Sequence, residues 1–105
     1  MARIPDEIKE KIDRYLNNLK KARIPIKGAV LFGSYARGTQ TEWSDIDIAL
    51  VSDRFKGNRF EDKDLIRHIT LAVSSEIEVL PFSPKDFNKK NPLAKEIIDT
   101  GIRLI

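Results

Sequence analysis

The chain has 105 residues, of which 41% are hydrophobic and 33% charged, with a formal net charge of +3 and no cysteine. The length predicts one domain over residues 1–105, the hydrophobic share excludes a disordered chain, and the lack of cysteine excludes disulfides and thiolate metal sites. No apolar run approaches the roughly 18–20 residues of a membrane span, and the first residues carry no hydrophobic signal region, so we expect a cytoplasmic, prokaryotic protein that has no membrane partner.

The first half of the chain predicts two helices and a strand. Apolar residues recur three and four positions apart from Pro5 to about Ala22, which is typical of an amphipathic helix. Residues 26–32 form a short apolar run, which indicates a buried strand, and residues 34–37 can form a short helix. Residues 39–44 then read as an exposed loop.

The second half of the chain predicts further strands and helices. Residues 45–50 alternate between apolar and other side chains, which predicts a strand, and residues 60–74 show the period of a helix. Residues 76–80 alternate again and give a third strand, which Pro81 should end. The remaining elements expected are a short turn of helix after Ser83-Pro84, a helix from Asn91-Pro92 to about Thr100, and an edge strand over residues 102–105. Strands that alternate with helices predict an α/β domain.

Two aspartates, Asp45 and Asp47, stand one residue apart in the second predicted strand. Side chains two positions apart share one side of a strand, so both carboxylates project together while Ile46 and Ile48 face the core. Close carboxylates repel and need a counter-charge, and Mg²⁺ is suited to this because it binds carboxylates together with substrate phosphates. Two metal ions about 3.5–4 Å apart can clamp the attacking and leaving oxygens of a nucleotidyl transfer.

Groups that can bind phosphate precede the aspartates. Gly33 lets the backbone approach a phosphate, Ser34 adds a hydroxyl donor, and Arg37 can reach a second phosphate oxygen. Residues 1–37 hold nine Lys and Arg against four Asp and Glu, whereas residues 38–64 hold four against seven. This distribution is unlike the single basic face of a nucleic-acid binder, and it suits a site where cations meet phosphates.

A third carboxylate near an acceptor hydroxyl would complete such a site. Glu76 and Glu78 lie on one face of the third predicted strand. Either can join the aspartates if that strand lies beside the second, and the spacing alone does not choose between them.

The stretch GSYARG at 33–38, followed by SDIDI at 44–48, resembles a known signature. This signature, GSxxRG…SDxDhxV with h hydrophobic, is that of the minimal nucleotidyltransferases of the DNA polymerase β superfamily. Both halves occur at the expected separation, and the similarity extends over most of the chain. The resemblance implies a single small polymerase β-like domain, with a mixed sheet and flanking helices.

The resemblance also implies roles for the matched residues. Gly33 and Ser34 would bind the triphosphate, and Asp45 and Asp47 would hold two Mg²⁺ ions. A third acidic residue, normally Asp, would bind the first metal and help to activate the attacking hydroxyl. Glu78, which two apolar residues follow, matches that position best, although a Glu reaches further than an Asp by one methylene.

The activity implied is transfer of a nucleoside monophosphate from a nucleoside triphosphate, with ATP the expected donor, to a hydroxyl acceptor. Stand-alone proteins of this kind are often antitoxins, and the resemblance implies a HEPN-type toxin as partner, silenced by adenylylation of a tyrosine. We expect another chain to complete the acceptor pocket, in a homo- or hetero-oligomer. The alternative is a nucleotide-binding module that neutralises its partner by direct binding. Transfer to an antibiotic or tRNA is less favoured, because those relatives carry additional domains.

Several residues also have simpler interpretations. Arg37 can form a surface ion pair with Glu42, and Glu76 can be an ordinary surface residue. His68 is expected at the surface or at a boundary. Trp43 can stack on a base, pack against the protein or contact a partner.

Overall fold

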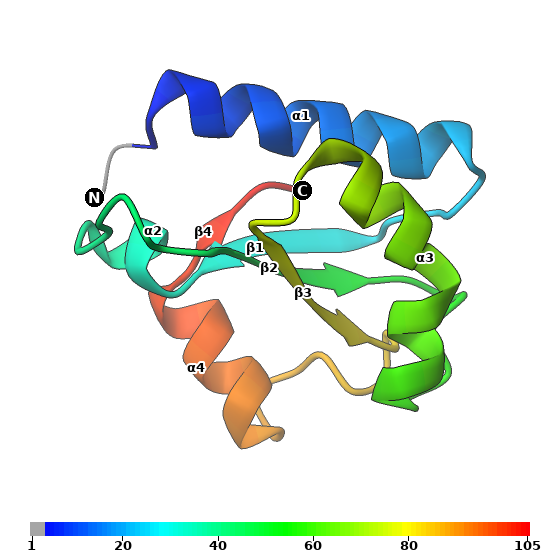
Figure 1. Ribbon diagram of the computed structural model, residues 1–105. Coiled ribbons are helices and arrows are strands. Elements are labelled where there is room, and N and C mark those ends of the chain that lie inside the picture. The colour runs from blue at the N-terminus through cyan, green and yellow to red at the C-terminus, as the bar shows by residue number, and fades with distance from the viewer. Residues whose placement is uncertain (1–3) are drawn as a thin grey trace.

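The computed structural model describes residues 4–105, in which helices and strands alternate along the chain (Figure 1). The elements are, in chain order, α1 (Asp6–Lys21), β1 (Gly28–Phe32), α2 (Ser34–Arg37), β2 (Ile46–Val51), α3 (Arg59–Val73), β3 (Ile77–Phe82), α4 (Pro92–Thr100) and β4 (Ile102–Arg103). The strands form one sheet in the order β3-β2-β1-β4. β1 runs antiparallel to β2 and β4, and β2 runs parallel to β3, so the expected α/β fold with a mixed sheet is confirmed.

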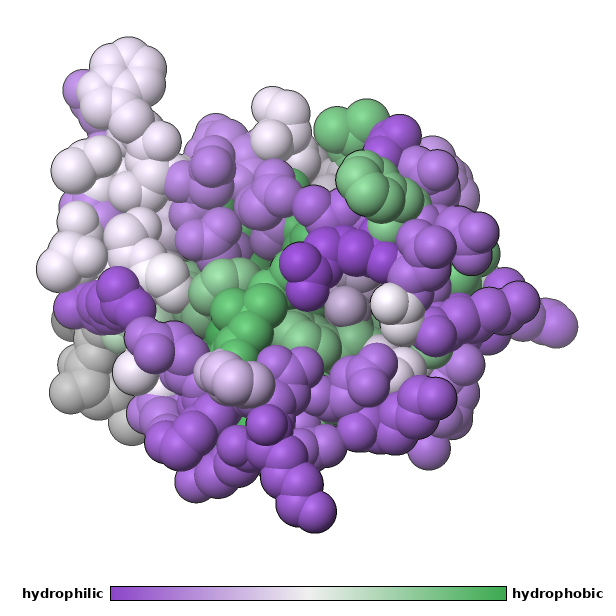
Figure 2. All heavy atoms as spheres, turned by 90° about the horizontal axis from the view of Figure 1, so that it is seen from below, coloured by the Kyte–Doolittle hydropathy of each residue, from purple (hydrophilic) through white to green (hydrophobic). Residues whose placement is uncertain are grey.

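The two faces of the sheet are covered unequally. α1 and α3 cover one face, over a large core that includes the fully buried Ile46 and Ile48. On the face of α4 the buried cluster is small and consists of Val30, Ala49, Val51, Phe82, Ala94 and Ile97. Seen from below, apolar surface stays visible at the centre of a polar surround (Figure 2). Because Asp47 and Ala49 share one side of β2, the thinly covered face is the one that carries the Asp47 side chain.

The first predicted helix is confirmed as α1. Its buried side chains are Ile8, Ile12, Tyr15 and Leu19, whose spacing of three and four residues makes one stripe against the core. Acidic residues lie in its first turn and basic residues in its last, where they complement the helix dipole. No helix within residues 4–105 is both long enough and apolar enough to cross a membrane.

A buried hydrogen bond joins α1 to α3. The Tyr15 hydroxyl lies 2.6 Å from Oγ1 of Thr70. Thr70 in turn donates to the carbonyl of Ile66 at 3.1 Å, so the Tyr15 hydroxyl is the donor to Thr70. Burial raises the pKa of Tyr15 to about 12, although the hydrogen bond with Thr70 acts in the opposite direction.

We expect Tyr15 to make the free energy of unfolding fall by about 1.4 kcal/mol per pH unit between its two pKa values. In the unfolded chain the phenol has a pKa near 10, whereas the folded protein keeps the proton up to about 12. Rising pH therefore favours the unfolded state over this range. Urea unfolding at about pH 8, 10 and 11 measures the decline, and Tyr15→Phe should remove this part of it. An equally steep decline in the variant would contradict the assignment to Tyr15.

The expectation that Pro81 ends the third strand is wrong. β3 continues to Phe82, and Pro81 is in register with Leu50 of β2. The Glu76 carbonyl accepts from the Ile46 amide of β2, and the Phe82 carbonyl accepts from Ser52, just after β2. Alternate residues of β3 therefore face β2, and Pro81 turns its nitrogen to the open edge. A proline is tolerated there because an edge strand needs no donor on its free side.

The short turn of helix expected after Ser83-Pro84 is also wrong, because residues 84–91 form turns and bends. The Ser83 hydroxyl donates to Oδ2 of Asp86 at 2.7 Å, and the Asp86 amide donates to the Ser83 carbonyl at 3.0 Å. The serine side chain is therefore used in a closed turn and does not cap a helix. The second helix start is confirmed, since Asn91 accepts from two amides of α4.

Candidate active site

Asp45 and Asp47 lie where β2 begins. Ile46 and Ile48 are fully buried below α1 and α3, so the alternation of the strand turns Asp47 to the face of α4. Asp47 is half-buried and Asp45, just before the strand, is exposed. The thin cover on this face leaves the two carboxylates open to a substrate.

The end of β1 brings the main chain against Asp47. Phe32, the last residue of β1, is opposite Asp47 in the antiparallel register, and Gly33 follows with φ of 75° and ψ of −150°. A Cβ atom on Gly33 would overlap Oδ2 of Asp47 and would lie 3.2 Å from its Cγ. This backbone conformation is one that glycine alone adopts readily. The Gly-Ser turn and the aspartate therefore form a single site.

The short helix α2 continues this turn. The Gly33 carbonyl accepts hydrogen bonds from two amides of α2, both at 3.1 Å, and Gly38 ends the helix in the left-handed conformation. The side chain of Tyr35 is buried, which fixes α2 on the core. Ser34 is left half-buried and Arg37 exposed at the surface beside the turn.

Arg37 forms its ion pair with Glu96 of α4, not with Glu42 as the simpler sequence interpretation suggests. Its Nη2 lies 3.2 Å from Oε1 of Glu96, and both side chains are more than half exposed. Figure 1 shows why these residues meet, because α2 and α4 lie at the same end of the sheet. An exposed pair of this kind contributes little to stability, so Arg37 is available to a phosphate.

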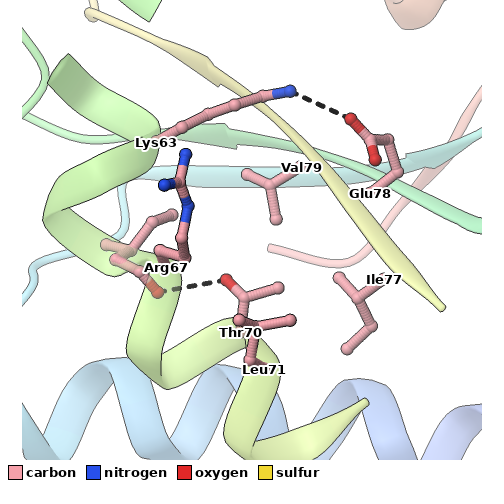
Figure 3. A pocket seen from close by; sticks show the side chains of 8 residues that line it. Lys63, Arg67, Thr70, Leu71, Ile77, Glu78 and Val79 are labelled. Carbon is pink, nitrogen blue, oxygen red and sulfur yellow. Dashed lines mark hydrogen bonds and ion pairs between the residues drawn. The ribbon is translucent and has the colours of Figure 1, made fainter. Parts of the chain in front are cut away.

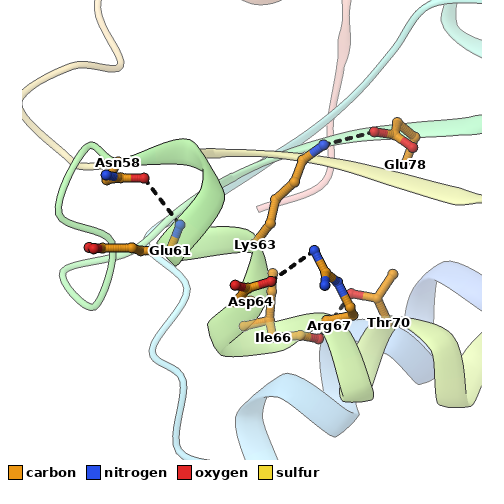
Figure 4. Close-up of polar contacts among 8 residues, drawn as sticks. All are labelled: Asn58, Glu61, Lys63, Asp64, Ile66, Arg67, Thr70 and Glu78. Atoms are coloured by element: carbon orange, nitrogen blue, oxygen red, sulfur yellow. Dashed lines mark hydrogen bonds and ion pairs between the residues drawn. The ribbon is translucent and has the colours of Figure 1, made fainter.

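β3 places Glu78 beside Asp47. The two residues are partners in the parallel register of β2 and β3, and neighbouring strands lie about 4.8 Å apart. The tip of Glu78 turns toward α3, where Nζ of Lys63 lies 2.9 Å from its Oε1 (Figure 4). Glu78 is thus close to the aspartates in the sheet, with its carboxylate engaged by a cation.

Glu76, just before β3, points elsewhere. Its Oε1 lies 3.8 Å from Nζ of Lys11 in α1. Burial raises the pKa of Tyr35, and the charge of Glu76 raises it further. The geometry therefore favours Glu78 over Glu76 as the third carboxylate.

Electrostatic repulsion among Asp45, Asp47 and Glu78 affects the ionisation of Asp47. Burial raises the pKa of Asp47 above its usual range, and the charges of Asp45 and Glu78 raise it further. The ionised form of Asp47 is therefore disfavoured in the protein alone. A divalent cation would remove this cost, and a set of carboxylate oxygens is the kind of donor that Mg²⁺ prefers.

As the side chains stand, residues 4–105 contain no group of three His, Cys, Asp or Glu side chains close enough to hold a metal ion. The Glu78 carboxylate is engaged with Lys63 of α3 instead. Asp45 and Asp47 remain as the carboxylate pair beside the Gly33 turn.

Sequence reasoning misses two partners of the site, Lys63 and Glu96. Both belong to helices that reach the site only through packing on the sheet, and no local spacing signals either contact. His68 is exposed on α3, as expected. Trp43 is 86% exposed in the loop before Asp45, which removes packing from its three interpretations.

Comparisons with known proteins agree with this geometry. A family model described as a nucleotidyltransferase domain matches residues 9–104. Three proteins of Methanocaldococcus jannaschii, each named as a candidate protein adenylyltransferase, are similar in sequence. One is 32% identical over 101 residues (90% of this chain, 68% of the relative), another is 54% identical over 80 residues (75% and 77%), and the third is 34% identical over 97 residues (91% and 92%).

Solved structures share the fold. A toxin–antitoxin complex, MntA–HpeT, contains a chain with a TM-score of 0.62 at 22% identity, over 90% of this chain and 71% of that chain. A toxin–antitoxin structure with AMP-PNP gives a TM-score of 0.62 at 27% identity, over 89% and 71%. A candidate nucleotidyltransferase from Sulfolobus solfataricus gives 0.59 at 17% identity, over 98% and 89%.

Proposed function

Because the chain belongs to the nucleotidyltransferase domain family, we propose that it transfers AMP from ATP to a hydroxyl group of a protein and releases pyrophosphate. The acceptor oxygen forms a bond to the α-phosphorus, the bond from that phosphorus to the pyrophosphate oxygen breaks, and the hydroxyl proton passes to a carboxylate or to water. The observation that carries this proposal is the approach of Gly33 to Asp47, with the charges of Asp45 and Glu78 around it.

The phosphate chain would lie on the Gly33 turn. The backbone at Gly33 leaves room for close approach, the Ser34 hydroxyl can donate, and Arg37 can exchange Glu96 for a phosphate oxygen. These groups do no covalent chemistry. They contribute by holding the phosphates in line and by offsetting negative charge.

Asp45 and Asp47 would hold the two Mg²⁺ ions that the family resemblance implies, with Glu78 joining them after it leaves Lys63. The support is that burial raises the pKa of Asp47 and the charges of Asp45 and Glu78 raise it further, and a divalent cation would offset both effects. When bound, Mg²⁺ supplies the positive charge that stabilises the triphosphate in the transition state. Glu78 is also suited to accept the proton of the attacking hydroxyl.

The acceptor that we propose is a tyrosine of a HEPN-type toxin, so that the chain acts as an antitoxin in the cytoplasm of a prokaryote. The support is that three relatives are named as candidate protein adenylyltransferases, and that a 27% identical structure is a toxin–antitoxin with AMP-PNP. In this proposal the chain binds ATP, and its partner provides the acceptor hydroxyl.

Thermal unfolding with ATP and Mg²⁺ tests the donor site without knowledge of the acceptor. Ligand at about 100 times its dissociation constant should stabilise the fold by roughly 2.7 kcal/mol. For a domain of this size the midpoint should then rise by roughly 10–20 °C. The double variant Asp45→Asn/Asp47→Asn should show no such rise.

A charge-matched control is Glu10→Gln/Asp53→Asn, which removes two exposed carboxylates of α1 and of the loop after β2. It should respond to ATP and Mg²⁺ as the wild type does. An unshifted wild-type midpoint at millimolar ATP and Mg²⁺ would count against the donor site.

A second candidate function is neutralisation of the partner by direct binding. The ion pair of Glu78 with Lys63, which keeps the third carboxylate from the aspartates, favours it. The two functions differ in the effect of Asp47→Asn on the toxin. Direct binding survives this substitution, whereas adenylylation does not.

A further inference from the structure

An apolar hollow lies beside the segment that joins α1 to β1. Its lining consists of Leu16, Asn17 and Lys20 of α1, residues 23–26 of the connecting segment, and Ile105. The volume is about 720 Å³, and sites for small molecules usually measure about 300–1,000 Å³. The hollow is therefore large enough for a small ligand.

The hollow is separate from the candidate active site. Residues 24–26 precede β1, whereas the Gly33 turn follows it, so the two lie at opposite ends of this strand (Figure 1). The five residues of β1 span roughly 16 Å. A ligand of the hollow would therefore bind apart from the nucleotide.

The lining combines an apolar floor with a cationic rim. Ile24 is buried at the floor, and Leu16 and Ile26 are half-buried around it. The side chains of Lys20 and Arg23 are exposed, and no carboxylate within residues 4–105 forms an ion pair with either. The lining itself contains no Asp or Glu. Its chemistry is thus complementary to a ligand with an apolar body and a negative charge.

The cleft between α3 and β3, shown in Figure 3, differs from this hollow in size and in charge. Its volume is about 230 Å³, and both of its cations already have partners. Nζ of Lys63 lies 2.9 Å from Oε1 of Glu78, and Nη2 of Arg67 lies 2.8 Å from Oδ1 of Asp64. Of the two, the hollow beside α1 is therefore the one whose positive charge is available to a ligand.

The backbone of Arg23 is independent evidence that its side chain is used. The Arg23 amide donates to the Lys20 carbonyl at 3.0 Å. The Ile24 amide donates to the Leu19 carbonyl at the same distance, so α1 ends in a Schellman motif. Arg23 has the left-handed φ of 61° that this motif needs, a conformation in which glycine is usual and a Cβ atom is unfavourable. Since glycine would form the same motif without strain, the arginine points to a use for its guanidinium.

We propose that this hollow is a second ligand site, which binds a small aliphatic carboxylate independently of the nucleotide. The carboxylate lies between Lys20 and Arg23, where the guanidinium can donate two parallel hydrogen bonds to it. The aliphatic chain lies on Leu16, Ile24 and Ile26, away from water. The inference goes beyond the proposed function and does not depend on it.

Methyl NMR of the 105-residue chain with octanoate tests the proposal directly. A ligand of this size with ordinary efficiency has a Kd of about 1 mM, so a titration to about 20 mM approaches saturation. The methyl signals of Leu16, Ile26 and Ile105 should shift with octanoate concentration. Those of Leu71 and Val79, which line the cleft of Figure 3, should stay in place. Octylammonium, with a chain of equal length and the opposite charge, should bind at least fivefold more weakly.

Two variants with altered exposed cations sharpen the test. Arg23→Gly should weaken octanoate binding at least fivefold. Its thermal midpoint should equal or exceed that of the wild type, because glycine adopts this backbone without strain, so the loss of binding cannot come from unfolding. Lys9→Gln removes an exposed cation of α1 that lies outside the hollow, and it should leave the Kd unchanged.

Equal binding by Arg23→Gly and the wild type, equal binding of octylammonium, or no shift of the hollow's methyl signals would each overturn the proposal. So would tighter binding of the peptide N-acetyl-Leu-Glu-Leu-amide than of octanoate, because the hollow would then suit an acidic segment of a partner protein. The titrations contain no ATP, so their failure is distinguishable from failure of the proposed function.

Discussion

Replacing Asp47 with asparagine is expected to lower the rate of AMP transfer by about 10³-fold and to raise the thermal midpoint of the ligand-free protein. Loss of one preorganised group that stabilises transition-state charge, such as an oxyanion-hole donor, costs about 10²–10³ in rate in other enzymes. Of the three carboxylates, Asp47 is the one that lies against the Gly33 turn, so we expect the upper end of this range. Transfer of labelled AMP to the partner protein measures the rate.

The expected gain in stability follows from the pKa of Asp47, which burial and the charges of Asp45 and Glu78 raise. A raised pKa means that the folded state holds the proton more tightly than the unfolded chain does. At neutral pH the ionised carboxylate therefore lowers the free energy of unfolding, and this cost shrinks as the pH falls. Asparagine removes it, and because Asp47 is only half-buried, solvent screening keeps the gain below about 1 kcal/mol, or less than roughly 8 °C.

The matched control is Asp53→Asn, just beyond the other end of β2. Asp53 forms an exposed ion pair with Lys27 at 3.0 Å and lies outside the site. Its loss should change neither transfer nor, within about 0.5 kcal/mol, stability. If Asp47→Asn transfers AMP within threefold of the wild type, the assignment of Asp47 is wrong. A lowered midpoint would show that its charge is already compensated in the free protein.

The parts of the site that lie within one stretch of chain are those that the sequence predicts well. The alternation that buries Ile48 turns Asp47 outward, and the glycine before the short helix α2 marks the turn at residue 33. Both features depend on the backbone period and on the conformational range of glycine. The outward direction of Asp47 and the turn at residue 33 therefore do not depend on the order of the strands in the sheet.

Contacts between distant segments are the parts that sequence reasoning misses. The pairing of Glu78 with Lys63 depends on how α3 packs on β3. Gly101, just after α4, shows the same limit, because no local pattern signals why glycine is needed there. It has an ordinary φ of −84°, and glycine is needed because Val30 and the Leu31 carbonyl occupy the space of a Cβ atom.

Replacing Gly33 with alanine should affect stability and nucleotide binding together. The φ of 75° with ψ of −150° costs an alanine about 1–3 kcal/mol, and its Cβ atom would overlap Oδ2 of Asp47. We expect a loss of roughly 2–3 kcal/mol, or about 10–20 °C in the midpoint. The turn must also move away from Asp47, so the stabilisation by ATP and Mg²⁺ should disappear even at temperatures where the variant is folded.

Gly38→Ala separates backbone strain from the contact with Asp47. Gly38 also has a positive φ, 72°, but its ψ of 20° lies in the left-handed region, which costs an alanine about 1–2 kcal/mol. This variant should lose stability and keep its response to ATP and Mg²⁺. If both variants lose the response, strain in α2 alone accounts for it. If only Gly33→Ala loses it, the close approach of the turn to Asp47 is what the nucleotide requires.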